Sequence, residues 1–146
     1  MHVLIVEPDA ALSALWARVL RRLGHQVFEA RGQRDAVRTI RERAVEVIIL
    51  DLVLEEGSAI ATADYAGYAR PDAQVITVTS SSFFSDGSIF QHMPNARAFV
   101  RTGTSPEDLA AMAEHYGGVL GRSSPGAAPG RRDAELPPLS GVADSP

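Results

Sequence analysis

Short apolar runs alternate with longer amphipathic segments along most of the chain. The segments His2–Val6 and Val45–Leu50 are apolar at nearly every position, as strands buried on both faces are. The same criteria predict three further strands, at Gln26–Glu29, Ala73–Val78 and Ala96–Val100. Each predicted strand is followed by a segment with helical character. The pattern therefore consists of five βα units, which is typical of a parallel sheet covered by helices on both faces.

The predicted helices begin and end at residues that favour helix termini. Asp9 is an N-cap for the first helix, and Gly24 ends it. Ser105, followed by a proline and an acid, opens the last helix, which is expected to run to about Tyr116. The remaining helices are predicted at 33–43, at 58–69 and, with a weaker pattern, at 85–92.

The C-terminal end of the chain differs in composition from the rest. From Gly121 onward, half of the residues are Gly, Pro or Ser, and no apolar periodicity is present. Such a segment cannot bury enough apolar surface to order itself. We therefore expect one folded domain over residues 1–118 and a disordered tail over 119–146, with no DNA-binding output domain such as a helix-turn-helix.

Composition excludes several classes of function. The net charge of −4 provides no basic surface for nucleic acid. No apolar run approaches the roughly 20 residues that cross a bilayer, and the N-terminus does not resemble a signal peptide. We expect a cytoplasmic protein. The chain has no cysteine, and each of its 14 basic residues is an arginine, so no lysine ammonium is available for chemistry.

Polar residues follow several of the predicted strands. Glu7 comes after the first strand, Asp51 after the third and Thr79 after the fourth. The carboxyl ends of parallel strands meet at one edge of a sheet, where open α/β sheets bind their ligands. Because an aspartate directly after the run "VIIL" does nothing for the folding of a buried strand, we interpret Asp51 as a functional residue.

Four segments resemble, in order, the receiver domain of two-component response regulators. They are "VLIVEPDAAL" (3–12), "VIILDLVLEEGSAI" (47–60), "VITVTSSS" (75–82) and "ARAFVRTGTSPEDL" (96–109). The resemblance covers residues 1 to about 118. It implies an α/β, flavodoxin-like, doubly wound fold with five parallel strands in the order 2-1-3-4-5, and a site between the first and third strands.

The resemblance also implies roles for individual residues. Asp51 matches the phosphoacceptor, and Glu7 matches the first acid of the metal pocket. Val53 matches the position whose backbone carbonyl binds the metal. Thr79 matches the hydroxyl that contacts the phosphoryl group, and Phe99 matches the switch aromatic on the fifth strand.

Two departures from the family pattern fall on charged positions. Pro8 stands where the family has its second acid, a direct Mg²⁺ ligand, and Thr102 stands on the invariant lysine when "SPEDL" is aligned without gaps. Sliding Arg101 onto the lysine would move Phe99 out of register. Neighbouring strand residues point to opposite faces, so Arg101 is expected to point away from the pocket.

These departures weaken the expected chemistry. Mg²⁺ is often bound through one or two carboxylates and waters, so Glu7, Asp51 and the Val53 carbonyl can still hold it, with lowered affinity. Asp9 is a fourth candidate ligand, although its role as a helix N-cap is the simpler interpretation. Thr102 offers the phosphoryl group a hydroxyl but no charge.

Three functions stay open. The favoured one is a phosphorelay receiver that accepts a phosphoryl group on Asp51, weakly, from a histidine kinase or phosphotransfer protein and signals by protein contact. Such a protein is not an enzyme in the usual sense. The second is a pseudo-receiver that acts as an interaction module without phosphorylation. The third, a flavodoxin-like enzyme, is disfavoured because "EPDA" replaces a phosphate-binding loop. The downstream target and a homodimeric state are left open.

Overall fold

The structure, a computed structural model, describes residues 1–80 and 93–122. Its strands form one parallel sheet in the order β2-β1-β3-β4-β5. This order confirms the predicted α/β, flavodoxin-like, doubly wound fold. The elements are β1 (His2–Val6), α1 (Ala10–Arg22), β2 (Gln26–Ala30), α2 (Gln33–Glu42), β3 (Val47–Asp51), α3 (Ala59–Ala69), β4 (Gln74–Thr79), β5 (Ala96–Arg101) and α5 (Pro106–Arg122).

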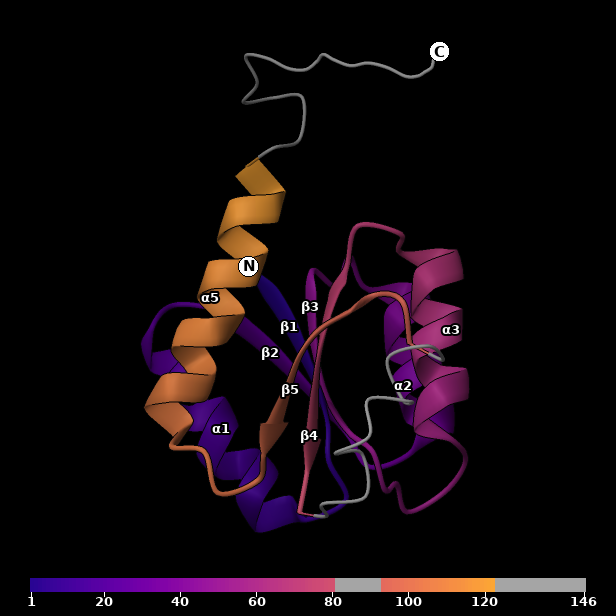
Figure 1. Ribbon diagram of the computed structural model, residues 1–146, viewed down its shortest axis with the longest axis horizontal. Coiled ribbons are helices and arrows are strands. Elements are labelled where there is room, and N and C mark those ends of the chain that lie inside the picture. The colour runs from indigo at the N-terminus through magenta and orange to yellow at the C-terminus, as the bar shows by residue number, and fades with distance from the viewer. Residues whose placement is uncertain (81–92, 123–146) are drawn as a thin grey trace.

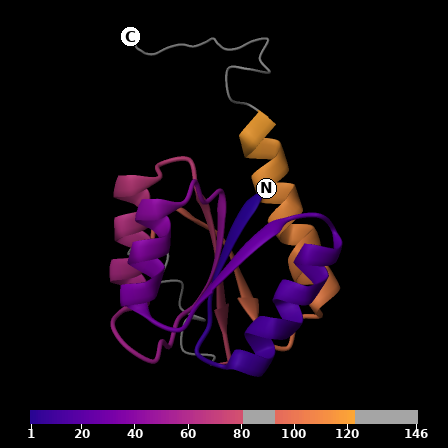
Figure 2. The ribbon, with the colours of Figure 1, turned by 180° about the vertical axis from the view of Figure 1, so that it is seen from behind.

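Helices cover the sheet on both faces. Helices α1 and α5 lie together on one face, and α2 and α3 lie together on the other (Figures 1 and 2). The β1 strand turns into α1 and the β3 strand turns toward α3 at the same edge of the sheet (Figure 1). That edge is the carboxyl end of every parallel strand, where the polar residues of the sequence gather.

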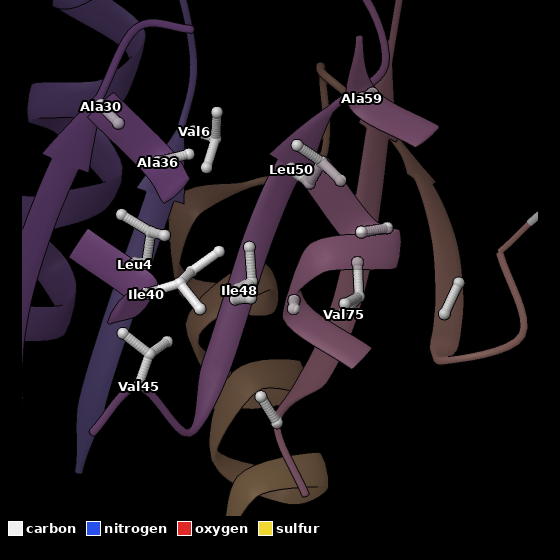
Figure 3. Close-up of a cluster of buried hydrophobic side chains, with 14 of the residues drawn as sticks. Leu4, Val6, Ala30, Ala36, Ile40, Val45, Ile48, Leu50, Ala59 and Val75 are labelled. Atoms are coloured by element: carbon white, nitrogen blue, oxygen red, sulfur yellow. The ribbon is translucent and has the colours of Figure 1, made fainter. Parts of the chain in front are cut away.

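Each face of the sheet has its own apolar core. On one face, Ile48 of β3 packs in a cluster with Ile40 of α2 (Figure 3). On the other face, the next residue of the strand, Ile49, packs with Trp16 of α1 and Leu109 of α5. Successive side chains of a strand point to opposite faces. A strand buried on both sides must therefore be apolar throughout, as "VIIL" is.

The helix termini follow the predicted capping residues. The Asp9 side chain accepts hydrogen bonds from the N–H groups of Ala11 and Leu12, at 3.0 and 3.1 Å, which confirms the N-cap. Gly24 follows α1 with φ +96°, a conformation that other residues rarely adopt. Helix α5 extends to Arg122, beyond the predicted end. No helix in the described ranges is long and apolar enough to span a membrane.

Several predicted boundaries shift by one or two residues. Strand β3 begins at Val47 rather than Val45 and includes Asp51, and β4 ends at Thr79. The predicted helix at 85–92 and the predicted tail beyond Arg122 lie outside the described residues. The division into a domain over 1–118 and a tail over 119–146 stays a prediction.

The two-sided core predicts unequal effects for two leucines of α1. Leu20 is 1% exposed, whereas Leu15 is 39% exposed. We expect Leu20→Ala to lower the free energy of unfolding by about 2–5 kcal/mol, because it removes buried methyl groups and leaves a cavity. Leu15→Ala should lower it by less than about 1 kcal/mol. Urea unfolding measures both, and equal losses would contradict this assignment of the core face.

Candidate functional site

The strand register brings Glu7 and Asp51 to the same edge of the sheet. Val6 of β1 pairs with Leu50 of β3, so the residues that follow them, Glu7 and Asp51, are neighbours. Thr79 ends the adjacent strand β4. All three side chains are buried, at 2%, 9% and 1% exposure. The structure therefore gathers three of the polar residues that the sequence predicts for the site.

Glu7 is held at its backbone and at one carboxylate oxygen. Its N–H donates to the carbonyl of Ala30 at 2.9 Å, and its Oε2 accepts the N–H of Asp9 at 3.0 Å. Within the described residues, the other oxygen, Oε1, is buried and receives no hydrogen bond. Burying a carboxylate oxygen without a donor is costly. The oxygen is therefore suited to a proton or to a bound cation.

The environment of Glu7 favours the protonated form. Burial raises the pKa of Glu7 from 4.5 to about 8, and a hydrogen bond between its side chain and Asp51 adds to the shift. The N–H of Asp9 acts in the opposite direction, and the negative charges of Asp51 and Asp9 raise the pKa further. Near neutral pH, in the absence of a cation, the two neighbouring carboxyl groups can share one proton.

Asp51 is oriented by the backbone that follows it. Its Oδ1 accepts the N–H of Val53 at 2.8 Å, and the N–H of Leu52 donates to the carbonyl of Val78 at 3.0 Å. The Val53 side chain is 62% exposed. The chain therefore curls around the carboxylate, and Val53 lies at the open side of the site.

The loop after Asp51 is fastened to the start of α2. The N–H of Gln33 donates to the Glu56 carbonyl at 2.9 Å, and the N–H of Arg34 donates to Glu56 Oε1 at 3.0 Å. In return, Gln33 Oε1 accepts the N–H of Ser58 at 2.8 Å. Gly57, with φ +81°, leaves room for the Gln33 side chain. These reciprocal hydrogen bonds satisfy N–H groups at the starts of α2 and α3, and they fix the loop that carries Val53.

Sequence reasoning did not find this contact between the two loops. The residues that make it lie more than twenty positions apart, and a polar glutamine beside a glycine is common in loops. The only local signal is Gly57, whose positive φ is compatible with a tight turn.

An open groove of about 520 Å³ lies at the carboxyl ends of β4 and β5. Arg101 and Thr102 both line it, although the alternation of a strand predicts that they face opposite ways. The strand ends at Arg101, and a turn closed by the N–H of Thr104 and the Arg101 carbonyl, at 2.9 Å, follows. The N–H of Thr102 donates to the Thr79 carbonyl at 2.9 Å. Among the described residues, its lining is Thr79, Ser80, Arg101, Thr102, Gly103 and Thr104.

Phe99, the predicted switch aromatic, lies on β5 opposite Thr77. Its half-buried ring packs against the core on the α2 and α3 face. A position on this face, in a strand next to Thr79, is compatible with the predicted role, which stays a prediction.

Two acidic side chains, and not three, meet at this site in the described part of the chain. Across residues 1–80 and 93–122, no three His, Cys, Asp or Glu side chains converge on one point. The Asp9 carboxylate caps α1. Glu7 and Asp51 remain as a pair, and the unbonded oxygen of Glu7 fits a divalent cation that takes its other ligands from backbone and water.

Comparisons with known proteins agree with this geometry. Residues 3–113 match the family model described as "Response regulator receiver domain". The chain belongs to this family of two-component signalling domains. No curated protein matches it.

Solved structures of receiver domains share the fold. A CheY-like receiver domain protein from Methanospirillum hungatei JF-1 has a TM-score of 0.76 and 20% identity, over 84% of this chain and 98% of its own. A response regulator from Burkholderia pseudomallei, solved with a phosphorylated aspartic acid, a calcium ion and citrate, has a TM-score of 0.70 and 19% identity. The match covers 88% of this chain and 75% of the Burkholderia chain. The response regulator TrrA from Thermotoga maritima, in complex with Mg²⁺–BeF, has a TM-score of 0.68 and 17% identity. The match covers 79% of this chain and 97% of the TrrA chain.

The raised pKa of Glu7 predicts a pH-dependent stability in the absence of divalent cations. Folded Glu7 keeps its proton to about pH 8, whereas an ordinary glutamate loses it near 4.5. Between these values the folded state binds more protons, so its stability is highest at the acidic end and is lost as the pH rises. Urea unfolding of the wild type and of Glu7→Gln between pH 5 and about 8 measures the difference. Parallel pH profiles for the two proteins would contradict the assignment.

The two roles considered for Asp9 predict different results for one substitution. Asparagine caps a helix about as well as aspartate, whereas alanine costs about 1 kcal/mol. We therefore expect Asp9→Ala to lower the free energy of unfolding and Asp9→Asn to leave it nearly unchanged. Calorimetric titration of Asp9→Asn with Mg²⁺ should give nearly the affinity of the wild type. A tenfold loss, about 1.4 kcal/mol, would instead identify Asp9 as a metal ligand.

Proposed function

We propose that the chain accepts a phosphoryl group on Asp51 and passes the signal on through protein–protein contacts. The observation that supports this most is the buried pair of Glu7 and Asp51, with an oxygen of Glu7 that no donor among the described residues reaches. Burying two neighbouring carboxyl groups is costly for folding. The arrangement is understandable if the pair binds a cation and a phosphoryl group.

The transfer step follows from the orientation of Asp51. Val53 holds Oδ1, so we assign the attack on phosphorus to Oδ2. A bond forms between Oδ2 and phosphorus while the bond from phosphorus to an imidazole nitrogen of a phosphohistidine breaks. The electron pair of that broken bond stays on the nitrogen, which takes up a proton. The donor is a histidine kinase or a phosphotransfer protein.

Mg²⁺ is the cation that we assign to the pair. Glu7, Asp51 and the Val53 carbonyl would hold it, and its charge would neutralise part of the charge on the transferred group. Pro8 removes one carboxylate ligand, so the affinity for Mg²⁺ is lower than a second acid would give. The Burkholderia and Thermotoga receivers bind calcium and Mg²⁺ respectively, which supports a divalent cation here.

We expect phosphorylation to be weak. Thr79 and Thr102 contribute hydroxyls near the phosphoryl group, but neither carries a charge. The protein acts as a phosphoacceptor with at most weak self-catalysed transfer, and not as an enzyme that turns over a substrate. We place it in the cytoplasm, with an as yet unidentified protein as its downstream target and no nucleic-acid partner.

The second candidate function is a pseudo-receiver that binds its partner without phosphorylation. Pro8 and Thr102 favour it, because each replaces a charged residue of the family pattern. Protonation of Glu7 also favours it, since a proton can satisfy the buried pair without any metal.

Intact mass measurement distinguishes the two candidates. The wild type is incubated with Mg²⁺ and acetyl phosphate, and Asp51→Asn serves as the control that keeps the size of the side chain. We expect one phosphoryl group to be added to the wild type and none to Asp51→Asn, because only the aspartate has an oxygen nucleophile that forms an acyl phosphate. An unchanged mass, with the fold shown intact by circular dichroism, would contradict the proposal and favour the pseudo-receiver.

A further inference from the structure

Helices α2 and α3 lie side by side on one face of the sheet and expose a surface that the candidate site does not use (Figures 1 and 2). Near their first turns, the Gln33 side chain of α2 accepts the N–H of Ser58, the N-cap of α3, at 2.8 Å. At their other ends, Arg70 after α3 donates to the carbonyls of Ile40 and Arg41 of α2, at 2.9 and 3.2 Å. These contacts at both ends align the two helices, so their exposed side chains form one surface.

Two arginines of α2 lack a partner, whereas a third has one. The Arg38 side chain donates to Asp35 Oδ1 at 2.7 Å, one turn earlier on the helix. Arg34 and Arg41 are exposed, and in the described part of the chain neither side chain makes an ion pair or a hydrogen bond. The two are seven positions apart, which is two helical turns or about 10 Å. They therefore present two unpaired guanidinium groups along one side of α2.

Helix geometry places these two arginines on the half of α2 that faces α3. Residues three or four positions apart share one side of a helix. Half-buried Val37 lies three positions after Arg34 and four before Arg41. Gln33, four positions before Val37, is the residue that contacts the start of α3. Asp35 lies on the other half of the exposed side of α2, so the half beside α3 carries positive charge and no carboxylate from its own helix.

Two tyrosines of α3 border the same surface. Tyr68 is 83% exposed. Tyr65, one turn earlier, is half-buried and packs against the core that α2 and α3 share, and the centroids of the two rings are 6.2 Å apart. On the opposite side of α3, Gly67 faces Asn95. Tyr65 therefore lies toward α2, and the two rings stand beside its unpaired arginines.

We propose that this α2–α3 surface docks an acidic amphipathic helix of a partner protein. The surface consists of Arg34, Val37, Arg41, Tyr65 and Tyr68. Arginine and tyrosine are among the side chains that contribute most to the binding energy of protein interfaces. A guanidinium donates two parallel hydrogen bonds to a carboxylate, and acids seven positions apart on a helix match the spacing of the two arginines. Apolar side chains between those acids would meet the tyrosine rings.

Other anionic partners fit this surface less well. A membrane-binding helix has large apolar residues along one face, and Tyr68 is the only exposed large apolar residue that α2 and α3 contribute in the described ranges. Nucleic acid binding requires many phosphate contacts and a basic domain, whereas two arginines are unpaired here and the chain carries a net charge of −4. Two carboxylates on a helix need only two partners. The inference goes beyond the proposed function, because it involves no transfer to Asp51.

The alternative is that these side chains are only a solvated helix face. Matched variants separate the two interpretations. Arg34→Glu combined with Arg41→Glu reverses both charges of the surface. Arg18→Glu combined with Arg22→Glu makes the same change in net charge at two exposed arginines of α1, which also lack an ion pair among the described residues. Tyr68→Ala removes the exposed ring, and Tyr68→Phe keeps it.

The probe is a synthetic helical peptide of Leu, Ala and Glu, with glutamates seven positions apart beside a stripe of leucines. Its affinity for the full chain is measured by calorimetric titration at low salt, without a phosphodonor. We expect the Arg34 and Arg41 variant to bind at least about tenfold more weakly than the wild type, because two charged contacts become repulsive. The Arg18 and Arg22 variant should match the wild type. Tyr68→Ala should bind about fivefold more weakly, and Tyr68→Phe should bind as the wild type does.

Urea unfolding checks that all of the variants are folded. Equal affinities for the two double variants, or no binding of the peptide to the wild type, would overturn the inference. Tighter binding to a DNA duplex or to phosphatidylglycerol vesicles than to the peptide, lost in the Arg34 and Arg41 variant, would also overturn it. None of these results bears on phosphorylation of Asp51, which the intact mass measurement tests separately.

Discussion

The pairing of β1 with β3 places two carboxyl groups side by side in a buried position, and much of the site follows from that. A shift of either strand by one residue would move each of its side chains from one apolar core into the other, so the register that packs both cores also keeps Glu7 and Asp51 neighbours. Burial raises the pKa of Glu7 to about 8, and the hydrogen bond with Asp51 and the charge of Asp51 add to the shift. A proton or a divalent cation must therefore accompany the pair.

The site has fewer fixed charges than its family pattern provides. Pro8 removes a negative ligand for the metal, and Thr102 removes a positive partner for the phosphoryl group. The two replacements offset each other in net charge, and under the proposed function each of them would weaken the binding of its ligand. The hydrogen bonds that Gln33 and Glu56 make between the two loops would keep the Val53 carbonyl in place although the site has fewer charged ligands.

The sequence was sufficient for the fold, because apolar runs, the Asp9 cap and Gly24 act locally and agree with one another. It also placed Glu7, Asp51 and Thr79 at one edge, since the ends of parallel strands must meet there. It did not predict the hydrogen bonds between the loop after β3 and the start of α2, because these join segments that are distant in the sequence. The direction of the Arg101 side chain relative to the acidic pair stays a prediction. The raised pKa of Glu7 depends on burial, which no local pattern measures.

The most direct test of the account is a crystal structure of the protein with Mg²⁺ and beryllofluoride, which occupies the place of a phosphoryl group on aspartate. We expect beryllium bonded to an oxygen of Asp51, and a metal ion in contact with Glu7, Asp51 and the Val53 carbonyl. The result that would contradict this is a pocket in which Glu7 is hydrogen-bonded to Asp51 and neither Mg²⁺ nor beryllofluoride is bound, at concentrations that saturate other receivers.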